Sequence, residues 1–287
     1  MKKLFAYCLS VCMLCALLAG CAKKEQAAAN RLEEIKARGT LTVATEPYFA
    51  PEEFIDPSKE GGEQYVGSDI ELAKYIADKL GVKLEVVPLD FTTVLSSVTE
   101  GKYDLAISAL AFKPDRAENM YLSDAYFVPR GEDTGYGFCV PASLADSVKT
   151  VGDIADKTVV VQQGSLQQFL WEQYGGPCKE VKYVSSTNDA FLAVSEGKAD
   201  VVVTAASFAN NYIAANADCG LVLQDFRFDV EDKYLGEVVG MKKGEDALLA
   251  EINAILAELN AAGTYYEWYD QYFDYAANLR DLGLLEE

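Results

Sequence analysis

Hydrophobic residues in the first part of the chain alternate between helical and strand-like spacing. Leu72, Ile76 and Leu80 recur every four residues, as on one face of a helix, and Gly81 ends the run. The apolar run at 103–108 is typical of a strand buried inside a parallel sheet. The pattern predicts helices at 31–38, 68–80 and 91–100 and strands at 41–45, 82–88 and 103–108.

A second round of the same rhythm begins near residue 150. It predicts strands at 158–162, 179–184 and 200–204 and helices at 165–174 and 188–196. The stretches EGKYDLA and EGKADVV, which begin at Glu100 and Glu196, match in spacing. Because only two copies exist, we interpret them as two α/β lobes rather than as a solenoid repeat. Strands that alternate with helices favour a mostly parallel sheet in each lobe.

Two segments are candidates for crossings between the lobes. Residues 129–137 (PRGEDTGYG) are rich in glycine and charge, and 224–233 form a second such segment. A strand at 234–242 and helices at 246–262 and 264–275 follow. The predicted organisation is a first lobe at 31–130, a second lobe at 131–230 and a return to the first lobe at 231–287. A cleft between the carboxyl ends of the two sheets is where open α/β folds bind ligands.

The first 20 residues have the pattern of a secretory signal. Lys2 and Lys3 precede an apolar run at 4–18, which ends in small residues. The run is short for a membrane span, which needs about 20 apolar residues, although a short anchor helix is the alternative. Residues 21–30 (CAKKEQAAAN) are then a short tether.

Charge and composition narrow the function. The chain of 287 residues has 45 acidic and 25 basic side chains, a net charge of −20 that would repel nucleic acid and anionic lipid. Half of the residues are hydrophobic, enough for two cores. The absence of histidine excludes catalytic triads, histidine-ligated zinc or haem, and imidazole pH switches.

Three cysteines remain beyond Cys21: Cys139, Cys178 and Cys219. They lack the close pairing typical of zinc sites, so we expect no metal. A bridge between Cys178 and Cys219 fits an exported protein, and buried free thiols are the alternative.

The chain resembles the amino-acid-binding family of extracellular solute-binding proteins that serve ABC importers. The resemblance rests on six stretches that cover nearly all of the chain past the tether, in order: LTVATEPYFAPEEF (41–54), VGSDIELAKYIADKLGVKLEVVPLDF (66–91), EGKYDLAISALAFKPDRAENMYLSDAYF (100–127), VVVQQGS (159–165), EGKADVVV (196–203) and AELNAAGTYYEWYDQYF (257–273). It implies a two-lobe fold of the periplasmic-binding-protein type II with two hinge crossings. It also implies a monomer with a small carboxylated ligand, an ABC permease as partner and no cofactor.

The residues before position 21 resemble the lipobox of bacterial lipoproteins, since Leu18, Ala19 and Gly20 precede Cys21. This resemblance implies that Cys21 is lipidated and that the protein is exported and held at the outer face of the cell membrane or in the periplasm.

Arg116 is the residue that the resemblance implies as the clamp for the ligand carboxylate. A guanidinium fits this role because it offers two parallel hydrogen bonds and keeps its charge; a surface arginine paired with Asp115 or Glu118 is the alternative. Free N–H groups where a helix opens would suit the same anion. The other implied contacts are the loop Ser108, Ala109, Leu110 and Ala111, the rings of Phe49 and Phe91, and Gln162, Gly164, Ser165, Leu166 and Thr204 of the second lobe.

The chain departs from the family where an ammonium group is usually bound. The usual second-lobe Asp falls at Ala205, and the frequent Ser or Thr of the first lobe falls at Ala111. Because an unpaired buried ammonium is costly, either another acid replaces the lost one or the ligand has no α-amino group. Glu46 and Glu52 are the candidate replacements, and solvated loop carboxylates are the alternative for both.

The leading hypothesis is a receptor that closes two lobes on an amino acid or related metabolite and delivers it to a permease. An enzyme on the same scaffold is the alternative, because secreted cyclohexadienyl dehydratases are similar in sequence to the family. Glu46, Glu52 or Glu237 would then be the general acid. A lipoprotein that senses ligands or adheres to surfaces, without transport, is a third possibility.

Overall fold

A computed structural model describes residues 30–131, 134–216 and 218–281. The predicted signal segment, Cys21 and all of the tether except Asn30 lie outside the described residues. Within those ranges, no helix has the length and apolar character needed to cross a bilayer.

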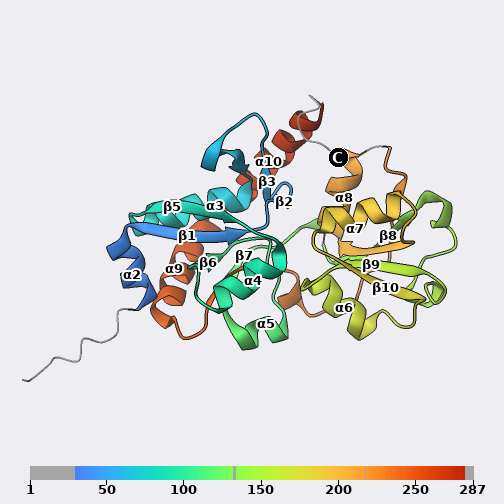
Figure 1. The fold of residues 1–287 in the computed structure, drawn as a ribbon, viewed down its shortest axis with the longest axis horizontal. Coiled ribbons are helices and arrows are strands. Elements are labelled where there is room, and N and C mark those ends of the chain that lie inside the picture. The colour runs from blue at the N-terminus through green and yellow to red at the C-terminus, as the bar shows by residue number, and fades with distance from the viewer. Residues whose placement is uncertain (1–29, 132–133, 217, 282–287) are drawn as a thin grey trace, which may run out of the picture. The chain divides into compact units, whose positions relative to one another are not determined.

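The first lobe is built on a five-stranded sheet with the order β5-β1-β6-β13-β7 (Figure 1). Its central strand β6 pairs with parallel β1 on one side and with antiparallel β13 on the other. The strands are β1 (Thr40–Thr45), β5 (Lys83–Pro88), β6 (Leu105–Ala106), β7 (Met120–Phe127) and β13 (Glu237–Lys242). The predicted return of the chain is therefore the entry of β13 into the middle of this sheet.

The second lobe repeats the plan with the order β10-β9-β11-β8-β12. Its strands are β8 (Tyr136–Pro141), β9 (Thr158–Gln162), β10 (Glu180–Val184), β11 (Val201–Ala205) and β12 (Leu221–Leu223). Strands β9, β10 and β11 are parallel, whereas β8 pairs antiparallel with both β11 and β12. In each sheet four of the five strands therefore run in the same direction, and the predicted mostly parallel sheet is confirmed. The exceptions are β13 in the first lobe and β8 in the second, the strands that enter each sheet directly after a crossing.

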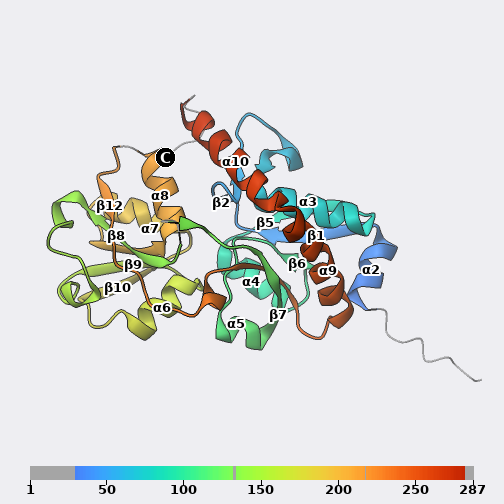
Figure 2. The same ribbon diagram turned by 180° about the vertical axis from the view of Figure 1, so that it is seen from behind.

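Helices pack on both sheets around apolar cores. In the first lobe they are α2 (Arg31–Arg38), α3 (Ser68–Leu80), α4 (Phe91–Thr99), α5 (Pro114–Asn119), α9 (Asp246–Ala262) and α10 (Thr264–Asp281). In the second they are α6 (Leu166–Tyr174), α7 (Thr187–Ser195) and α8 (Ala206–Ala215). Figure 2 shows α10 running along α3 and α9, where aromatic residues of α10 join the first core. The pattern did not predict α5, α8, β7, β8 or β12.

A small third sheet, also not predicted, lies at the edge of the first lobe. It consists of β2 (Tyr48–Phe49), β3 (Glu53–Ile55) and β4 (Tyr65–Val66), all antiparallel. The described residues also include four short 3-10 turns: Gly61–Gln64, Ala142–Leu144, Val151–Asp153 and Asp232–Tyr234. Two-residue strands carry too little periodicity to be recognised from sequence.

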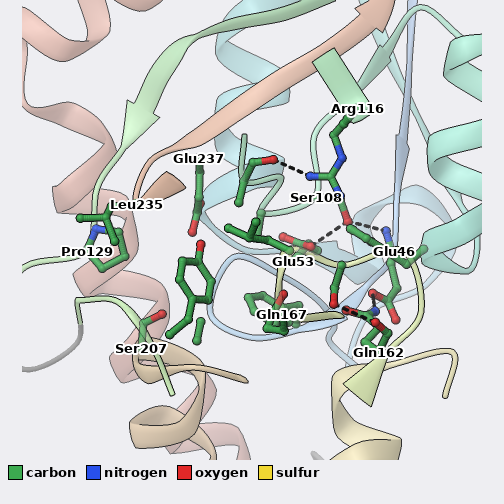
Figure 3. Close-up of a pocket in the computed structure, with 18 of the residues that line it drawn as sticks. Glu46, Glu53, Ser108, Arg116, Pro129, Gln162, Gln167, Ser207, Leu235 and Glu237 are labelled. Carbon is green, nitrogen blue, oxygen red and sulfur yellow. Dashed lines mark hydrogen bonds between the residues drawn. The ribbon is translucent and has the colours of Figure 1, made fainter. Parts of the chain in front are cut away.

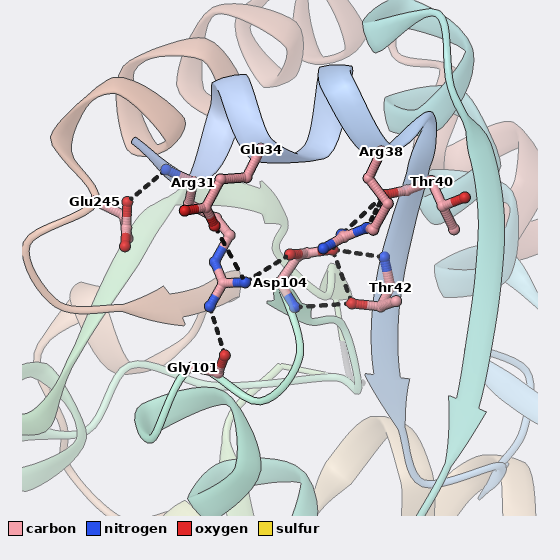
Figure 4. A network of polar contacts seen from close by, with 8 residues as sticks. All are labelled: Arg31, Glu34, Arg38, Thr40, Thr42, Gly101, Asp104 and Glu245. Carbon is pink, nitrogen blue, oxygen red and sulfur yellow. Dashed lines mark hydrogen bonds and ion pairs between the residues drawn. The ribbon is translucent and has the colours of Figure 1, made fainter. Parts of the chain in front are cut away.

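The matching EGKYD and EGKAD stretches have a structural cause. The Asp104 carboxylate, buried at 2% exposure, accepts hydrogen bonds from the backbone N–H and the hydroxyl of Thr42 at the start of β1 (Figure 4). Asp200 accepts in the same way from the backbone N–H of Thr158 at the start of β9, at 2.7 Å. Each Asp therefore sets the register of its strand against the neighbouring strand.

Asp104 also forms ion pairs, which distinguish it from Asp200. It also binds the guanidinium groups of Arg31 and Arg38, which attach α2 to the first sheet (Figure 4). We expect Asp104→Asn to lower the free energy of unfolding by about 2–3 kcal/mol, because two arginines lose a buried partner while the half-exposed Arg38 regains water. Asp200→Asn is the matched control and is expected to cost about 1 kcal/mol. Equal losses in urea titrations would contradict this role for the ion pairs.

Candidate functional site

A cavity lies where the carboxyl ends of both sheets meet, within the unit formed by residues 31–287. Glu46 follows β1, Ser108 follows β6, and Gln162 and Ala205 end β9 and β11. This is the position that parallel strands favour for a ligand site, because loops from several strands converge there. Figure 3 shows the polar side chains that line it.

Side chains of the two lobes contact each other across the cavity. The amide of Gln162 donates to Glu46 Oε2 at 2.9 Å, and the rings of Phe49 and Phe208 stack with their centroids 4.3 Å apart. The free volume is about 40 Å³, room for roughly three water molecules. A ligand the size of an amino acid therefore requires the lobes to separate or the side chains to move.

Arg116, on the short helix α5, is buried beside the cavity with 5% of its surface exposed. Its Nη1 donates to the Ala111 carbonyl, its Nη2 donates to the Gly164 carbonyl at 3.0 Å, and its Nε has no hydrogen-bond partner. Its guanidinium carbon lies 5.7 Å from the centre of the Phe91 ring. Burial lowers the pKa of Arg116 to about 10, which still leaves it charged at neutral pH.

The alternative of a surface arginine is therefore wrong. Asp115 forms an ion pair with Lys113 instead, at 3.1 Å. The buried guanidinium faces carbonyl groups, and its Nε is a donor without a partner. It therefore has capacity for an anionic ligand, since a carboxylate would supply the negative charge that the carbonyls lack.

The start of α6 forms the second-lobe wall. The Ser165 hydroxyl caps the helix by accepting from the backbone N–H of Gln168, as the spacing of the two residues suggests. Ser165 and Leu166 line the cavity, but Gly164 does not. The Gly164 N–H already donates to the Gln168 side chain, and its φ of +79° turns its carbonyl toward Arg116. Gly164 is thus a partner of Arg116 rather than a donor to the cavity.

Three glutamates line the same cavity: Glu46, Glu53 and Glu237. Burial raises the pKa of Glu46 to about 8, although the hydrogen bond from Gln162 opposes the shift. Burial also raises the pKa values of Glu53 and Glu237 well above the ordinary range, and neighbouring acids raise them further. A positive ligand group would restore the charge of these side chains.

A buried polar network supports the loop after β6. Asp69, near the start of α3, accepts from the backbone N–H of Ala109 and from the hydroxyls of Tyr126 and Tyr265. Ala109 has a φ of +44°, an uncommon conformation for alanine, which the bond to Asp69 helps to hold. The Ser108 hydroxyl donates to Glu53 and accepts from the backbone N–H of Glu46. The loop is therefore pinned on both sides.

Glu52 is buried at 1% exposure but does not line the cavity. It lies near Asp69 and Glu237, and burial raises its pKa well above the usual range. The interpretation of Glu46 and Glu52 as solvated loop carboxylates is wrong for both, since Glu46 is only 4% exposed. Of the two, only Glu46 reaches the cavity.

The structure brings most of the sequence-predicted residues together. Eleven line the cavity: Glu46, Phe49, Phe91, Ser108, Ala109, Ala111, Arg116, Gln162, Ser165, Leu166 and Ala205. Glu52, Leu110, Gly164 and Thr204 do not. Leu110 packs into an apolar cluster, and the buried Thr204 hydroxyl donates to the backbone of Ala205.

Sequence reasoning missed several lining residues. Glu53, Tyr136, Gln167 and Ser207 were not candidates, and Glu237 was considered only as a general acid. A usable signal existed for Glu237, because an acidic residue opens the apolar run EVVGM of a buried strand. The others come from segments whose approach to the cavity depends on the folded chain.

The described part of the chain contains no group of acidic or cysteine side chains arranged to hold a metal ion. Cys139, Cys178 and Cys219 are free thiols, so of the two alternatives left open for Cys178 and Cys219 the structure shows the unbridged one. Cys139 is buried, which raises its pKa, and the other two are half-buried.

The family is decided by comparison with known sequences. The sequence model of the bacterial extracellular solute-binding proteins, family 3, matches residues 41–275. The chain belongs to this family. The prediction made from its sequence motifs is confirmed, and the chain is an exported solute-binding protein.

Known relatives agree in sequence and in fold. The chain is 26% identical over 212 residues to the ABC transporter arginine-binding protein 1 of Escherichia coli (strain K12). The aligned region covers 73% of this chain and 82% of the relative. The chain is 30% identical to an amino acid ABC transporter substrate-binding protein, AbpA, from Streptococcus pneumoniae Canada MDR_19A bound to L-arginine, with a TM-score of 0.76, covering 85% of this chain and 98% of that one.

A third relative bears on the enzyme alternative. The chain is 29% identical to the ancestral amino acid-binding protein AncCDT-1, a precursor of cyclohexadienyl dehydratase, with a TM-score of 0.71, covering 85% of this chain and all of that one. Even this relative is named as a binding protein. The two-lobe fold and the binding role are thus confirmed, and the relatives do not favour an enzyme.

Proposed function

We propose that this protein captures an amino acid in the cavity between its lobes and delivers it to an ABC permease. One observation carries the proposal: a buried Arg116 with an unpartnered Nε shares a cavity with three glutamates. An amino acid has the complementary charges, since its carboxylate suits the arginine and its ammonium suits a glutamate.

We propose L-arginine as the first ligand to test. The similar proteins described above are named for arginine or contain it. The number of acids supports a ligand with a second positive charge, because three glutamates face a single arginine. A guanidinium or ammonium on the ligand side chain would pair with an acid that the main-chain ammonium leaves free.

The capture mechanism that we propose is hinge closure of a monomer. The lobes correspond to residues 31–130 with 231–287 and to 131–230. The two crossings are tied together, because the Tyr136 hydroxyl donates to the Tyr234 carbonyl and the Phe228 N–H donates to the Tyr136 carbonyl. A ligand that contacts both lobes favours the closed arrangement by its differential affinity for it.

The proposal includes membrane attachment through a lipid on Cys21, with residues 22–30 as the tether after removal of the signal segment. Two or more acyl chains would hold the protein far better than one. The solute-binding protein would then remain at the outer face of the membrane beside its permease.

Isothermal titration calorimetry with L-arginine tests the proposed ligand class. We expect saturable binding with one site, and at least tenfold weaker binding of L-citrulline, which replaces the guanidinium by a neutral urea of the same shape. The reason is that a neutral group leaves a buried carboxylate without its counter-charge. The other standard amino acids are titrated in parallel. Absence of binding to every amino acid would contradict the proposal.

A further inference from the structure

None of the described second-lobe residues that line the cavity is acidic, and Ala205 lines it at the end of β11. A replacement acid must come from another wall of the cavity. Glu46, Glu53 and Glu237 are the acidic side chains among the described residues that line it. Figure 3 shows them distributed around the cavity, with Glu237 and Glu46 well separated and Glu53 between them in this view.

Glu237 is joined through its backbone to the loop that Arg116 binds. Arg116 donates to the Ala111 carbonyl, and Ala111 forms an antiparallel bridge with Glu237. The next residue, Val238, donates its N–H to the Leu110 carbonyl at 2.7 Å. Two backbone contacts therefore hold the start of β13 against the loop that Arg116 also binds.

The Glu237 side chain is buried and incompletely bonded. It is 8% exposed, it lines the cavity, and its Oε2 has no hydrogen-bond partner. The Oε2 of Glu53, a residue 1% exposed, has none either. Buried carboxylate oxygens without donors are costly, so an arrangement that keeps two of them at a cavity suits a ligand that brings donors.

We propose that Glu237, supported by Glu53, binds the α-ammonium group of the ligand in place of an acid from the second lobe. This inference rests on the proposed function. In an α-amino acid one carbon atom carries both the carboxylate and the ammonium, so the acid that binds the ammonium must lie beside the arginine that binds the carboxylate. Glu237 is the candidate because it is bridged to Ala111, whose carbonyl accepts from Arg116, and because both side chains line the cavity.

Glu46 has a different place in this arrangement. It lies across the cavity from Glu237 in Figure 3 and accepts a hydrogen bond from Gln162 of the second lobe. It therefore faces the distal part of the ligand. The specificity that follows is for an α-amino acid with a positively charged side chain, with its main-chain ammonium held entirely by the first lobe.

A cycle of protein and ligand variants tests the role of Glu237. L-Arginine and 5-guanidinopentanoate differ only in the α-amino group. We expect the wild-type protein to bind L-arginine at least a hundredfold more tightly than the analogue. In Glu237→Gln, which keeps the shape of the side chain, L-arginine should bind at least thirtyfold more weakly, and the preference for L-arginine should fall below about fivefold.

Glu52→Gln is the matched control, since it removes the same kind of ionisable carboxyl group from the same buried cluster but at a position outside the cavity. It should retain most of the wild-type preference. Thermal unfolding and circular dichroism check that each variant is folded. If Glu237→Gln keeps the full preference, or if Glu52→Gln loses as much, Glu237 does not bind the ammonium although the proposed function stands. If the wild-type protein binds no amino acid, the proposed function itself fails.

If the wild-type protein binds another α-amino acid but not L-arginine, the same cycle is run with that amino acid and the carboxylic acid that lacks its α-amine. The expected and contradicting outcomes are unchanged. In that case the inference about Glu237 is tested independently of the side-chain preference.

Discussion

Arg116→Ala is expected to lower the affinity for L-arginine by about thirtyfold or more. The guanidinium would form charge-assisted hydrogen bonds to the ligand carboxylate, and the loss of one partner of such a buried pair costs about 2–5 kcal/mol. The 5% exposure of Arg116 and its open Nε make this interaction strong, because little water competes for it. Calorimetric titration of both proteins measures the loss directly.

Two measurements separate a binding role from a structural role for Arg116. Arg116→Lys keeps a positive charge but loses the fork, so it should bind L-arginine with intermediate affinity. The unliganded Arg116→Ala protein should lose no more than about 2 kcal/mol of unfolding free energy. The loss of the hydrogen bonds to Ala111 and Gly164 lowers stability, but the variant no longer has to bury a charge, which offsets part of that loss. A large loss of stability with unchanged affinity would show that Arg116 is structural.

The unliganded protein is expected to lose stability as the pH rises from about 5 to 8. Burial raises the pKa of Glu46 from 4.5 to about 8, and it raises the pKa values of Glu53 and Glu237 in the same direction. In the unfolded chain these groups return to their ordinary pKa values, so between pH 5 and 8 the folded protein binds more protons. The protonated glutamates contribute their full stabilisation below about pH 4.5, and this contribution is lost as the pH rises through the folded pKa values. The free energy of unfolding falls by at most about 1.4 kcal/mol per pH unit for each such glutamate.

Urea titrations across this pH range measure the slope. Glu46→Gln removes one of the titrating groups and should flatten the fall in stability, whereas Glu63→Gln, an exposed position, should not. A cationic ligand favours the ionised glutamates, so its affinity should rise with pH over the same range while binding releases protons. A stability that rises from pH 5 to pH 8 would contradict the raised pKa values.

The local pattern of the chain predicts most of the regular structure. The helices Arg31–Arg38 and Asp246–Ala262 and the strand Thr158–Gln162 have the predicted bounds, because their periodicity is continuous and glycine follows each helix. Motif spacing places Ser108 just after β6, as the structure shows. The strands β2, β3 and β4 and the helix α5 were missed because they are too short to show a period, but the longer elements α8, β7 and β8 were missed as well.

The composition of the cavity could be predicted only in part, and the reason is distance along the chain. Glu53 and Ser108 are 55 residues apart, and Glu237 meets Ala111 only because β13 returns across the hinge and enters the first sheet between β6 and β7. No local pattern encodes such a meeting.

By itself, the sequence determined the family, the α/β rhythm and the two lobes, and the family resemblance pointed to Arg116 as a candidate contact. These follow from periodicity and motif spacing, which are properties of neighbouring residues. The tertiary structure alone decided that β13 and β8 run against the other strands of their sheets, that Glu52 faces the core while Glu46 faces the cavity, and that Glu237 and Arg116 both contact Ala111. Those outcomes depend on which side of each strand is buried and on which distant strands pair, and both are set by the packing of the whole chain.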